Sequence, residues 1–207
     1  EIAETMAAEE HERSILFLAV TLEESGLLGS SYFVEYPTVE MNQLVAGFNI
    51  DAYQPDGLAR DITVIGYGAS ELEDMLAEVV AADDRVLAPD PSPQAGFFYR
   101  SDQAPFVKAG VPMLYIKQGF DQLDGGFAVG KAADEVHYAQ RYHKPMDEVL
   151  PSFNYDGLAA DAQAITTVAT DLANSGEWPS WYAGNEFEAV RQASLSGGGN
   201  LSTSGQD

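Results

Sequence analysis

The chain of 207 residues contains no cysteine, three histidines and ten basic residues. Without cysteine, disulfides, thiolate metal sites and cysteine nucleophiles are excluded, so a metal has to be bound by His, Asp and Glu. The 33 acidic residues give a net charge of −23, which repels a phosphate-rich partner along most of the surface. The composition therefore argues against nucleic acid as a partner. Such acidity also occurs on ordinary solvated surfaces, and it identifies no substrate.

Long apolar runs are also absent. No run reaches the roughly 18 to 20 residues that a membrane-spanning helix needs, and the first residues, EIAETMAAEEHERS, are acidic, unlike a signal peptide. The chain starts without an initiator Met, and we expect residues upstream of it. Because 45% of the residues are hydrophobic, we expect one α/β domain over residues 1–191. Residues 192–207 are rich in Gly and Ser and are predicted to be a disordered tail.

Short apolar runs alternate with segments of helical character. The run SILFLAVTL at 14–22 predicts a central strand buried on both faces, followed by a helix that ends at Pro37. Three further strands are predicted at 44–50, 61–68 and 111–117, two helices at 71–83 and 155–173, a Pro-rich loop at 88–102 and a long ordered loop at 118–145. This order predicts a three-layer α/β/α sandwich with a mostly parallel mixed sheet, in which chemistry gathers at the carboxyl ends of the strands.

Three acidic residues directly follow predicted strands. Glu23 and Glu24 follow the first strand, and Asp51 follows the second. A carboxylate near an apolar interior costs several kcal/mol unless it is paired or binds a metal, so the adjacent pair needs a physical reason. The simpler interpretation is that the pair forms the polar edge of a turn, with one carboxylate capping the next helix. Asp51 alone is weak evidence, because Asp is common in turns after strands.

His143 lies in the segment RYHKPMDE, where Pro145 stiffens the loop and would hold the imidazole in place. A lone histidine is more often a satisfied loop residue than a metal ligand, and we treat His11 and His137 as ordinary. Taken together, however, the three acidic residues and His143 form an oxygen-and-imidazole set that suits zinc, with one carboxylate left to act as a base.

Five segments occur in order along the chain: SILFLAVTLEESGLLGSSYFVEYP, FNIDAY, FYRSDQAPFVKAGVPMLYI, RYHKPMDE and LANSGEWPSWYAGNEF. Together they resemble the M28 family of zinc metallopeptidases. The last segment is similar to the closing region of secreted members that also carry a protease-associated domain, and the resemblance extends from residue 14 to about residue 190.

The resemblance implies a zinc-dependent aminopeptidase with two metals in each site. It implies that Glu23 is the general base, that Glu24 and His143 share one zinc, and that Asp51 binds the other. Three further residues match the segment that lines the substrate pocket in relatives: Tyr99, Ser101 and Asp102.

Two ligands of the family pattern are missing from this sequence. The family has a His in an HxD motif and a bridging Asp upstream of the paired glutamates, but only His11, in HER, precedes Glu23 here. We therefore expect the C-terminal part of a catalytic domain, with weak or partial zinc binding and little activity of its own. We also expect the run at 14–22 to be an exposed edge, which pairs with the missing N-terminal part or with another copy.

Other functions stay open at this stage. The chain could be a non-catalytic M28-fold binding module, or an acyltransferase of the glutaminyl cyclase type with a single zinc. The resemblance implies that the parent protein is secreted or periplasmic, and that its substrates are peptides. The preference for a substrate side chain cannot be deduced from the sequence.

Overall fold

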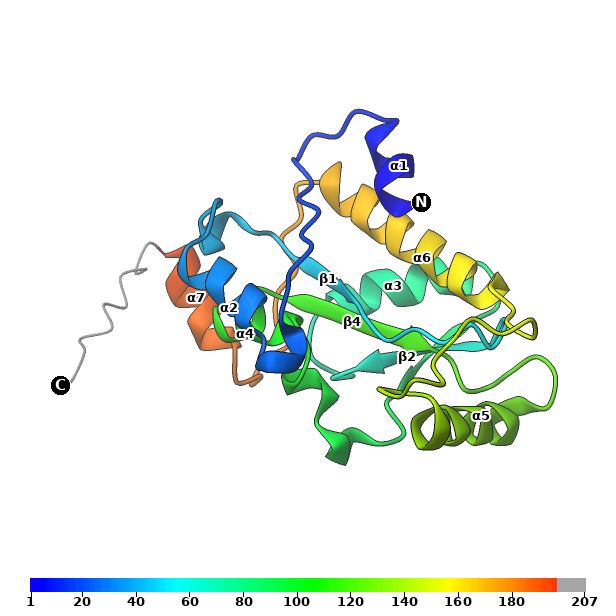
Figure 1. The fold of residues 1–207 in the computed structure, drawn as a ribbon. Helices are drawn as coiled ribbons and strands as arrows, with labels where there is room; N and C mark the ends of the chain where they lie inside the picture. Colours follow the sequence, from blue (N-terminus) through cyan, green and yellow to red (C-terminus); the bar gives the residue numbers. More distant parts are fainter. Residues whose placement is uncertain (197–207) are drawn as a thin grey trace.

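The computed structural model describes residues 1–196, and its centre is a four-stranded sheet (Figure 1). The strand order is β1-β4-β2-β3, where β1 is Gly47–Ile50, β2 Asp61–Ile65, β3 Val86–Pro89 and β4 Met113–Gln118. Strand β1 is parallel to β4 and β2 is parallel to β3, whereas β2 and β4 are antiparallel. The mixed, mostly parallel sheet that the sequence predicts is therefore confirmed.

One face of the sheet carries the main hydrophobic core. Ile62 and Val64 of β2 and Leu114 and Ile116 of β4 point to this face, because side chains alternate along a strand. They pack against α3 (Leu72–Ala81) and α6 (Asp156–Ala173), both predicted from the sequence. Each fully buried aliphatic side chain stabilises the fold by about 1.5–3 kcal/mol.

The opposite face of the sheet is more polar. Thr63, Tyr115 and Lys117 point to it, and all three are buried. Helix α5 (Gly126–Gln140) lies on this side of the sheet, away from α3 and α6 (Figure 1). Helices on both faces complete the three layers, and this polar face positions most of the site described below.

The other helices pack around the end of the sheet near β1. Helices α2 (Leu28–Glu35) and α4 (Gln103–Lys108) meet through Phe33 and Phe106, whose ring centroids are 5.7 Å apart. The guanidinium of Arg191, in α7 (Glu188–Leu195), donates to the carbonyls of Leu44 and Val45 at 2.7 and 3.1 Å. The remaining elements are α1 (Ile2–Ala7) and the 3-10 turns η1 (Glu23–Ser25), η2 (Met41–Gln43), η3 (Pro93–Ala95) and η4 (Phe97–Tyr99).

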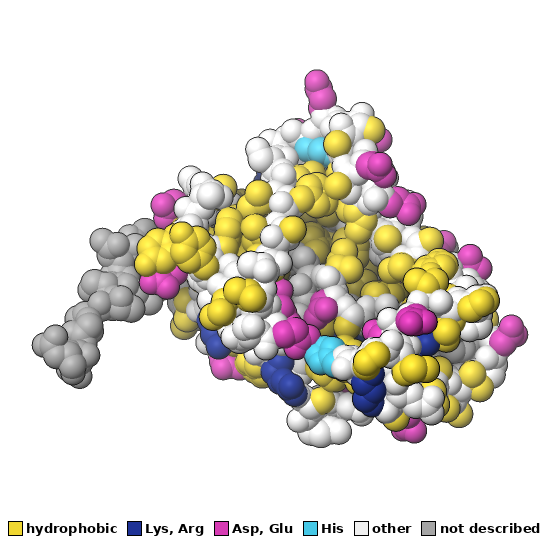
Figure 2. All heavy atoms as spheres, viewed as in Figure 1, with side chains coloured by type: hydrophobic (Ala, Val, Ile, Leu, Met, Phe, Trp, Pro, Cys, Tyr) yellow, Lys and Arg dark blue, Asp and Glu magenta, His cyan; other side chains and the backbone are white. Residues whose placement is uncertain are grey.

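The prediction of a central strand at 14–22 is wrong. This segment is extended but joins no ladder among the described residues, and Leu16, Phe17 and Leu18 are 50%, 54% and 42% exposed. An apolar run becomes a sheet strand only where a neighbouring strand satisfies its backbone. Figure 2 shows apolar side chains gathered on this face around the extended segment.

The prediction of a long loop at 118–145 is also wrong, because α5 occupies the middle of this segment. The helix begins at Gly126, which has a positive φ like the preceding Gly125, and it contains four helix-favouring Ala residues. Only Gly130 in it is buried, and a Cβ there would lie 2.2 Å from the carbonyl oxygen of Phe120. The helix therefore approaches the sheet through a small residue. Because it has no strong apolar stripe, the spacing of hydrophobic residues in the sequence does not reveal it.

Two smaller corrections concern boundaries. Strand β3 begins at Val86 and extends into the predicted loop at 88–102. The predicted disordered tail at 192–207 begins inside α7, which continues to Leu195, and its last eleven residues, 197–207, lie outside the described residues. No helix in the described part of the chain is long and apolar enough to cross a membrane.

Candidate active site

The paired glutamates lie in a tight turn rather than after a strand. Glu23 and Glu24 begin the 3-10 turn η1, which Leu22 enters with a φ of 58° and Gly26 leaves with a φ of 99°. Left-handed backbone at a leucine is strained, and such strain occurs most often at functional sites. The turn is held by hydrogen bonds from the amides of Gly26 and Leu27 to the Glu23 carbonyl, at 3.0 and 2.9 Å.

Asp51 follows the last residue of β1 and is held by a chain of polar side chains. The hydroxyl of Ser101 donates to Oδ2 of Asp51 at 2.8 Å. The amide of Asn49 donates to Oγ of Ser101 at 3.0 Å and to Oε1 of Gln103 at 2.8 Å. Since Ser101 and Gln103 are buried, this network fixes the orientation of the Asp51 carboxylate.

His143 meets Glu24 although the two residues are far apart in the sequence. Its Nε2 lies 2.6 Å from Oε1 of Glu24, and its ring stacks on Tyr142 with a centroid separation of 3.8 Å. His143 also has a positive φ, of 56°. The structure therefore brings together two of the residues predicted to share a metal, and both are more than half exposed.

Glu23 lies among other carboxylates. Its pKa is raised by partial burial and then by the negative charges of Glu24, Asp51 and Asp102, while His143 opposes this shift. The negative charges that repel Glu23 therefore lie near it in space. A raised pKa makes a carboxylate a stronger proton acceptor, which suits a general base.

The three residues expected to line a substrate pocket differ in their surroundings. Ser101 contacts Asp51, as described, and Asp102 accepts a hydrogen bond from the hydroxyl of Ser30 at 2.7 Å. Tyr99 is half exposed, and its hydroxyl donates to Oε1 of Glu186 at 2.6 Å. Ser101 and Asp102 therefore lie beside the acidic residues, whereas Tyr99 is engaged at the surface.

The two other histidines have local partners. The Nε2 of His11 is 2.8 Å from the carbonyl oxygen of Met6, and His137 packs edge-on against Tyr138 within α5. Among residues 1–196, neither histidine has a hydrogen bond or ion pair with Glu23, Glu24, Asp51 or His143.

Comparison with known proteins assigns the chain to a family. The family model described as Peptidase family M28 matches residues 1–169. The chain belongs to peptidase family M28. No curated protein matches it significantly.

Two solved structures show the same fold as this M28 chain. The Legionella pneumophila LapA aminopeptidase superposes with a TM-score of 0.55 at 17% identity, over 85% of this chain and 43% of that one. An aminopeptidase from Aneurinibacillus sp. strain AM-1 gives a TM-score of 0.51 at 18% identity, over 77% of this chain and 33% of that one. The M28 chain therefore spans less than half the length of either aminopeptidase.

The donors in this M28 chain match zinc in kind but not in number. Glu24 and His143 form one adjacent pair, and Asp51 is a separate single donor. No group of three or more His, Cys, Asp or Glu is placed to hold a metal ion within residues 1–196. Because a stable zinc site has three or four protein ligands, these residues do not make a self-contained zinc site.

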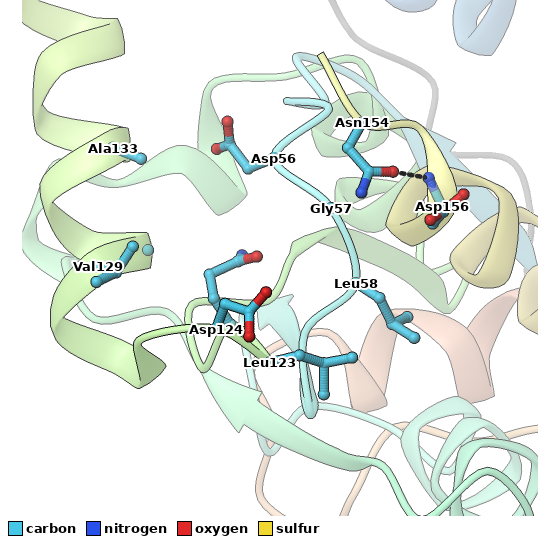
Figure 3. Close-up of a pocket in the computed structure, with 11 residues that line it drawn as sticks. Asp56, Gly57, Leu58, Leu123, Asp124, Val129, Ala133, Asn154 and Asp156 are labelled. Carbon is cyan, nitrogen blue, oxygen red and sulfur yellow. Dashed lines mark hydrogen bonds between the residues drawn. The ribbon is translucent and has the colours of Figure 1, made fainter. Parts of the chain in front are cut away.

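Two cavities accompany the site, and the sequence analysis predicted neither. The larger, of about 570 Å³, lies on the polar face of the sheet and includes Lys117, Thr63 and Tyr138. The smaller, of about 320 Å³, lies between α5 and the start of α6 (Figure 3). Asp56 and Asp124 border the smaller cavity, but it includes none of the predicted site residues. Lys117 was missed because a single basic residue inside a strand pattern carries no motif.

Proposed function

We propose that this chain is the C-terminal part of a zinc aminopeptidase catalytic domain that hydrolyses the N-terminal peptide bond of peptides. The observation that carries the proposal is the contact of 2.6 Å between His143 and Glu24 next to Glu23, with Asp51 held separately. Membership of family M28 supports peptide hydrolysis. The finer assignment of an aminopeptidase is supported by the two solved structures that share the fold, both of which are aminopeptidases.

The side chains divide the chemical work in this proposal. Glu23 takes the proton from the water that attacks the peptide carbonyl and then delivers it to the leaving amine. Glu24 and His143 would hold one zinc and Asp51 the other, together with donors from outside the described residues. When bound, the zinc ions would supply Lewis-acid polarisation and lower the pKa of water. Ser101 and Asn49 would keep the Asp51 carboxylate oriented.

Glu23 suits the base and Glu24 the ligand for a physical reason. Glu24 is committed to His143, whereas no hydrogen bond to the Glu23 side chain was found among the described residues. A carboxylate whose lone pairs bind a metal is a poor proton acceptor, so separate roles for adjacent residues are what the reaction needs. The raised pKa of Glu23 supports the same division.

The experiment that tests the proposal combines zinc content with hydrolysis. The chain is dialysed against zinc, the bound metal is measured by elemental analysis, and release of the N-terminal residue from peptides is followed by mass spectrometry. We expect substoichiometric zinc, which falls further in Glu24→Ala and His143→Ala but not in Glu23→Gln. Zinc content that is the same in all variants would contradict the ligand assignment.

Two outcomes of the product analysis would replace the proposal. Cyclisation of peptides that begin with Gln, without hydrolysis, would indicate an acyltransferase of the glutaminyl cyclase type. Peptide binding without any turnover, also after the upstream part of the catalytic domain is supplied as a separate chain, would indicate a non-catalytic binding module.

A further inference from the structure

The cavity of about 570 Å³ lies between α5 and the polar face of the sheet. Its floor includes Thr63 from β2 and Lys117 from β4, and Phe97 and Tyr138 form part of its wall. Its volume lies within the range of about 300–1,000 Å³ that is typical of small-ligand pockets.

Lys117 is a buried cation without a carboxylate partner. It is 8% exposed, and its Nζ lies 3.1 Å from the hydroxyl of Tyr138 and 4.4 Å from the centre of the Phe97 ring. No carboxylate lies within 4.0 Å of it in the part of the chain that the structure describes. An ammonium has three N–H donors, and one hydrogen bond to a tyrosine leaves two of them available.

Thr63 offers a second available donor beside Lys117. It is 1% exposed, and its hydroxyl has no hydrogen-bond partner among residues 1–196. Thr63 and Lys117 are paired in register across the antiparallel strands, so both side chains point to the same face. A buried hydroxyl without a partner is costly, and a ligand atom that accepts a hydrogen bond would remove this cost.

Three carboxylates also line the cavity, and each has a closer partner than Lys117, although the charges of Asp90 and Asp134 still act on Lys117 and oppose the lowering of its pKa by burial. Lys131 lies 3.6 Å from Asp134 and 4.0 Å from Glu135, so this second cation is neutralised on α5 itself. Asp90 accepts a hydrogen bond from the amide of Ser92 at 2.7 Å. Lys117 is therefore the positive charge in this cavity that still lacks a carboxylate.

Lys117, which lines the cavity, lies beside Asp51 across two neighbouring strands of the sheet. Ile50 of β1 is in register with Ile116 of β4, so the next residues along the two parallel strands are Asp51 and Lys117. Both lie on the polar face, because they follow Ile50 and Ile116 by one residue. A substrate whose N-terminus lies near Asp51 would have its first side chain within reach of this cavity.

We propose that this cavity receives the N-terminal side chain of the substrate and that Lys117 and Thr63 select an acidic side chain, Asp or Glu. The assignment of the ligand as a substrate rests on the proposed function. The ammonium and the hydroxyl complement a carboxylate, which only accepts hydrogen bonds. A Lys or Arg side chain meets a like charge there, and an aliphatic side chain leaves both donors without partners.

Binding of single-residue probes to the whole chain, measured by calorimetry, tests the proposal without requiring turnover. The probes are the α-amides of glutamic acid, glutamine, methionine and lysine, which differ only in the side chain. We expect the glutamic acid amide to bind at least about tenfold more tightly than the glutamine amide. In Lys117→Met this preference disappears, and in the isosteric Thr63→Val it falls by about threefold or more.

Lys131→Met is the matched control, because it removes the same charge from the same cavity but from an ammonium that is already paired. It should retain most of the preference for the glutamic acid amide. Equal binding of the glutamic acid and glutamine amides, a preference that survives Lys117→Met, or no binding of any probe would overturn the proposal.

A parallel hydrolysis assay on Glu-, Leu- and Lys-initiated peptides, with the upstream part of the domain supplied, separates the two proposals. Hydrolysis without a preference for Glu would refute the selection of acidic side chains by the cavity and leave the peptidase assignment intact. Selective binding of the glutamic acid amide without hydrolysis of any peptide would refute the peptidase assignment, while the cavity would still be a site that binds acidic side chains.

Discussion

The imidazole of His143 lies 2.6 Å from the carboxylate of Glu24, and both side chains are more than half exposed. Exposed ion pairs typically contribute about 0–1 kcal/mol to stability, since water screens the charges and ordering the side chains costs entropy. The contact therefore contributes little to the stability of the fold, as expected for two residues whose role is to bind a metal.

His143→Ala should leave the stability of the chain almost unchanged while it lowers zinc binding. We expect a change in the free energy of unfolding below about 1 kcal/mol, measured by urea denaturation with zinc removed. With zinc present, the wild type should gain more stability than the variant, because a ligand that binds the folded state stabilises it. A loss of several kcal/mol without zinc would show that His143 is structural.

The buried ion pair between Arg85 and Asp161 should behave in the opposite way. The two side chains are 5% and 3% exposed, with Nη2 and Oδ1 2.6 Å apart, and Arg85 also donates to the carbonyls of Ala59 and Asp61. Burial raises the pKa of Asp161 to about 8, so the pair is fully charged only above that pH. Measured there, Asp161→Ala leaves the buried guanidinium without its carboxylate and should cost about 3–5 kcal/mol of the free energy of unfolding.

The matched control is Asp121→Ala, which removes the exposed ion pair with Arg60 at 3.3 Å. It should cost less than about 1 kcal/mol. Similar losses for Asp161→Ala and Asp121→Ala in chemical denaturation would argue against the buried pair.

Glu23→Gln should raise the melting temperature of the zinc-free chain near neutral pH. The pKa of Glu23 is raised above its ordinary value of 4.5, first by burial and then by Glu24, Asp51 and Asp102. A carboxyl group with a raised pKa favours the folded state while protonated, and this contribution is lost as pH rises through the folded-state pKa. The neutral amide avoids that loss.

The advantage of Glu23→Gln should therefore shrink below the ordinary pKa of Glu23, where the wild-type carboxyl group is protonated in both states. Thermal scans in EDTA between about pH 4 and about pH 8 measure the difference in melting temperature between Glu23→Gln and the wild type, because this range extends from near the ordinary pKa of Glu to well above it. The same difference in melting temperature at both ends of this range would contradict the prediction.

Gly130→Ala should destabilise the chain even though Ala favours helices. In an exposed helix the change would stabilise by about 1 kcal/mol. Here the added Cβ would lie 2.2 Å from the carbonyl oxygen of Phe120, so α5 has to move away from the sheet. Gly176→Ala is the control, because no atom lies within 4 Å of a Cβ at that position. A rise in melting temperature for Gly130→Ala would show that α5 packs differently.

The extended segment at 14–22 should make the chain self-associate. Leu16, Phe17 and Leu18 are exposed, and β1 pairs only with β4 within residues 1–196. Unpaired apolar edges tend to join another chain. Sedimentation velocity should show concentration-dependent association that Phe17→Glu reduces, with Val136→Glu, a similarly exposed site on helix α5, as control. A stable monomer at all concentrations would count against the prediction.

The sequence predicts the elements whose pattern is local and strong. Helices α3 and α6 and strands β1, β2 and β4 lie where periodicity or apolar runs place them. Helix α5 was missed because its buried contact is a glycine, which leaves no apolar stripe in the sequence. The strand at 14–22 was wrong because strand formation depends on a neighbour that the sequence of the segment cannot supply.

The site divides in the same way. Segments that resemble the family identify Glu23, Glu24, Asp51 and His143, and the structure brings Glu24 and His143 into contact. Their assigned roles stay predictions. Lys117 could not be found from the sequence, because its meaning arises only from its register with Thr63 and its position next to Asp51 across β1 and β4.

Left-handed backbone at non-glycine residues occurs beside all the predicted metal ligands. Leu22 precedes the paired glutamates, Ala52 follows Asp51, and His143 has this conformation itself. For an L-residue other than glycine this conformation costs about 1–2 kcal/mol. Glycine adopts this conformation without that cost, so selection for thermal stability alone would favour glycine at these positions. At Leu22 and Ala52 glycine would relieve the strain but hold the neighbouring carboxylates less firmly, and at His143 it would remove the predicted ligand itself, so stability and the predicted site make opposite demands on these positions.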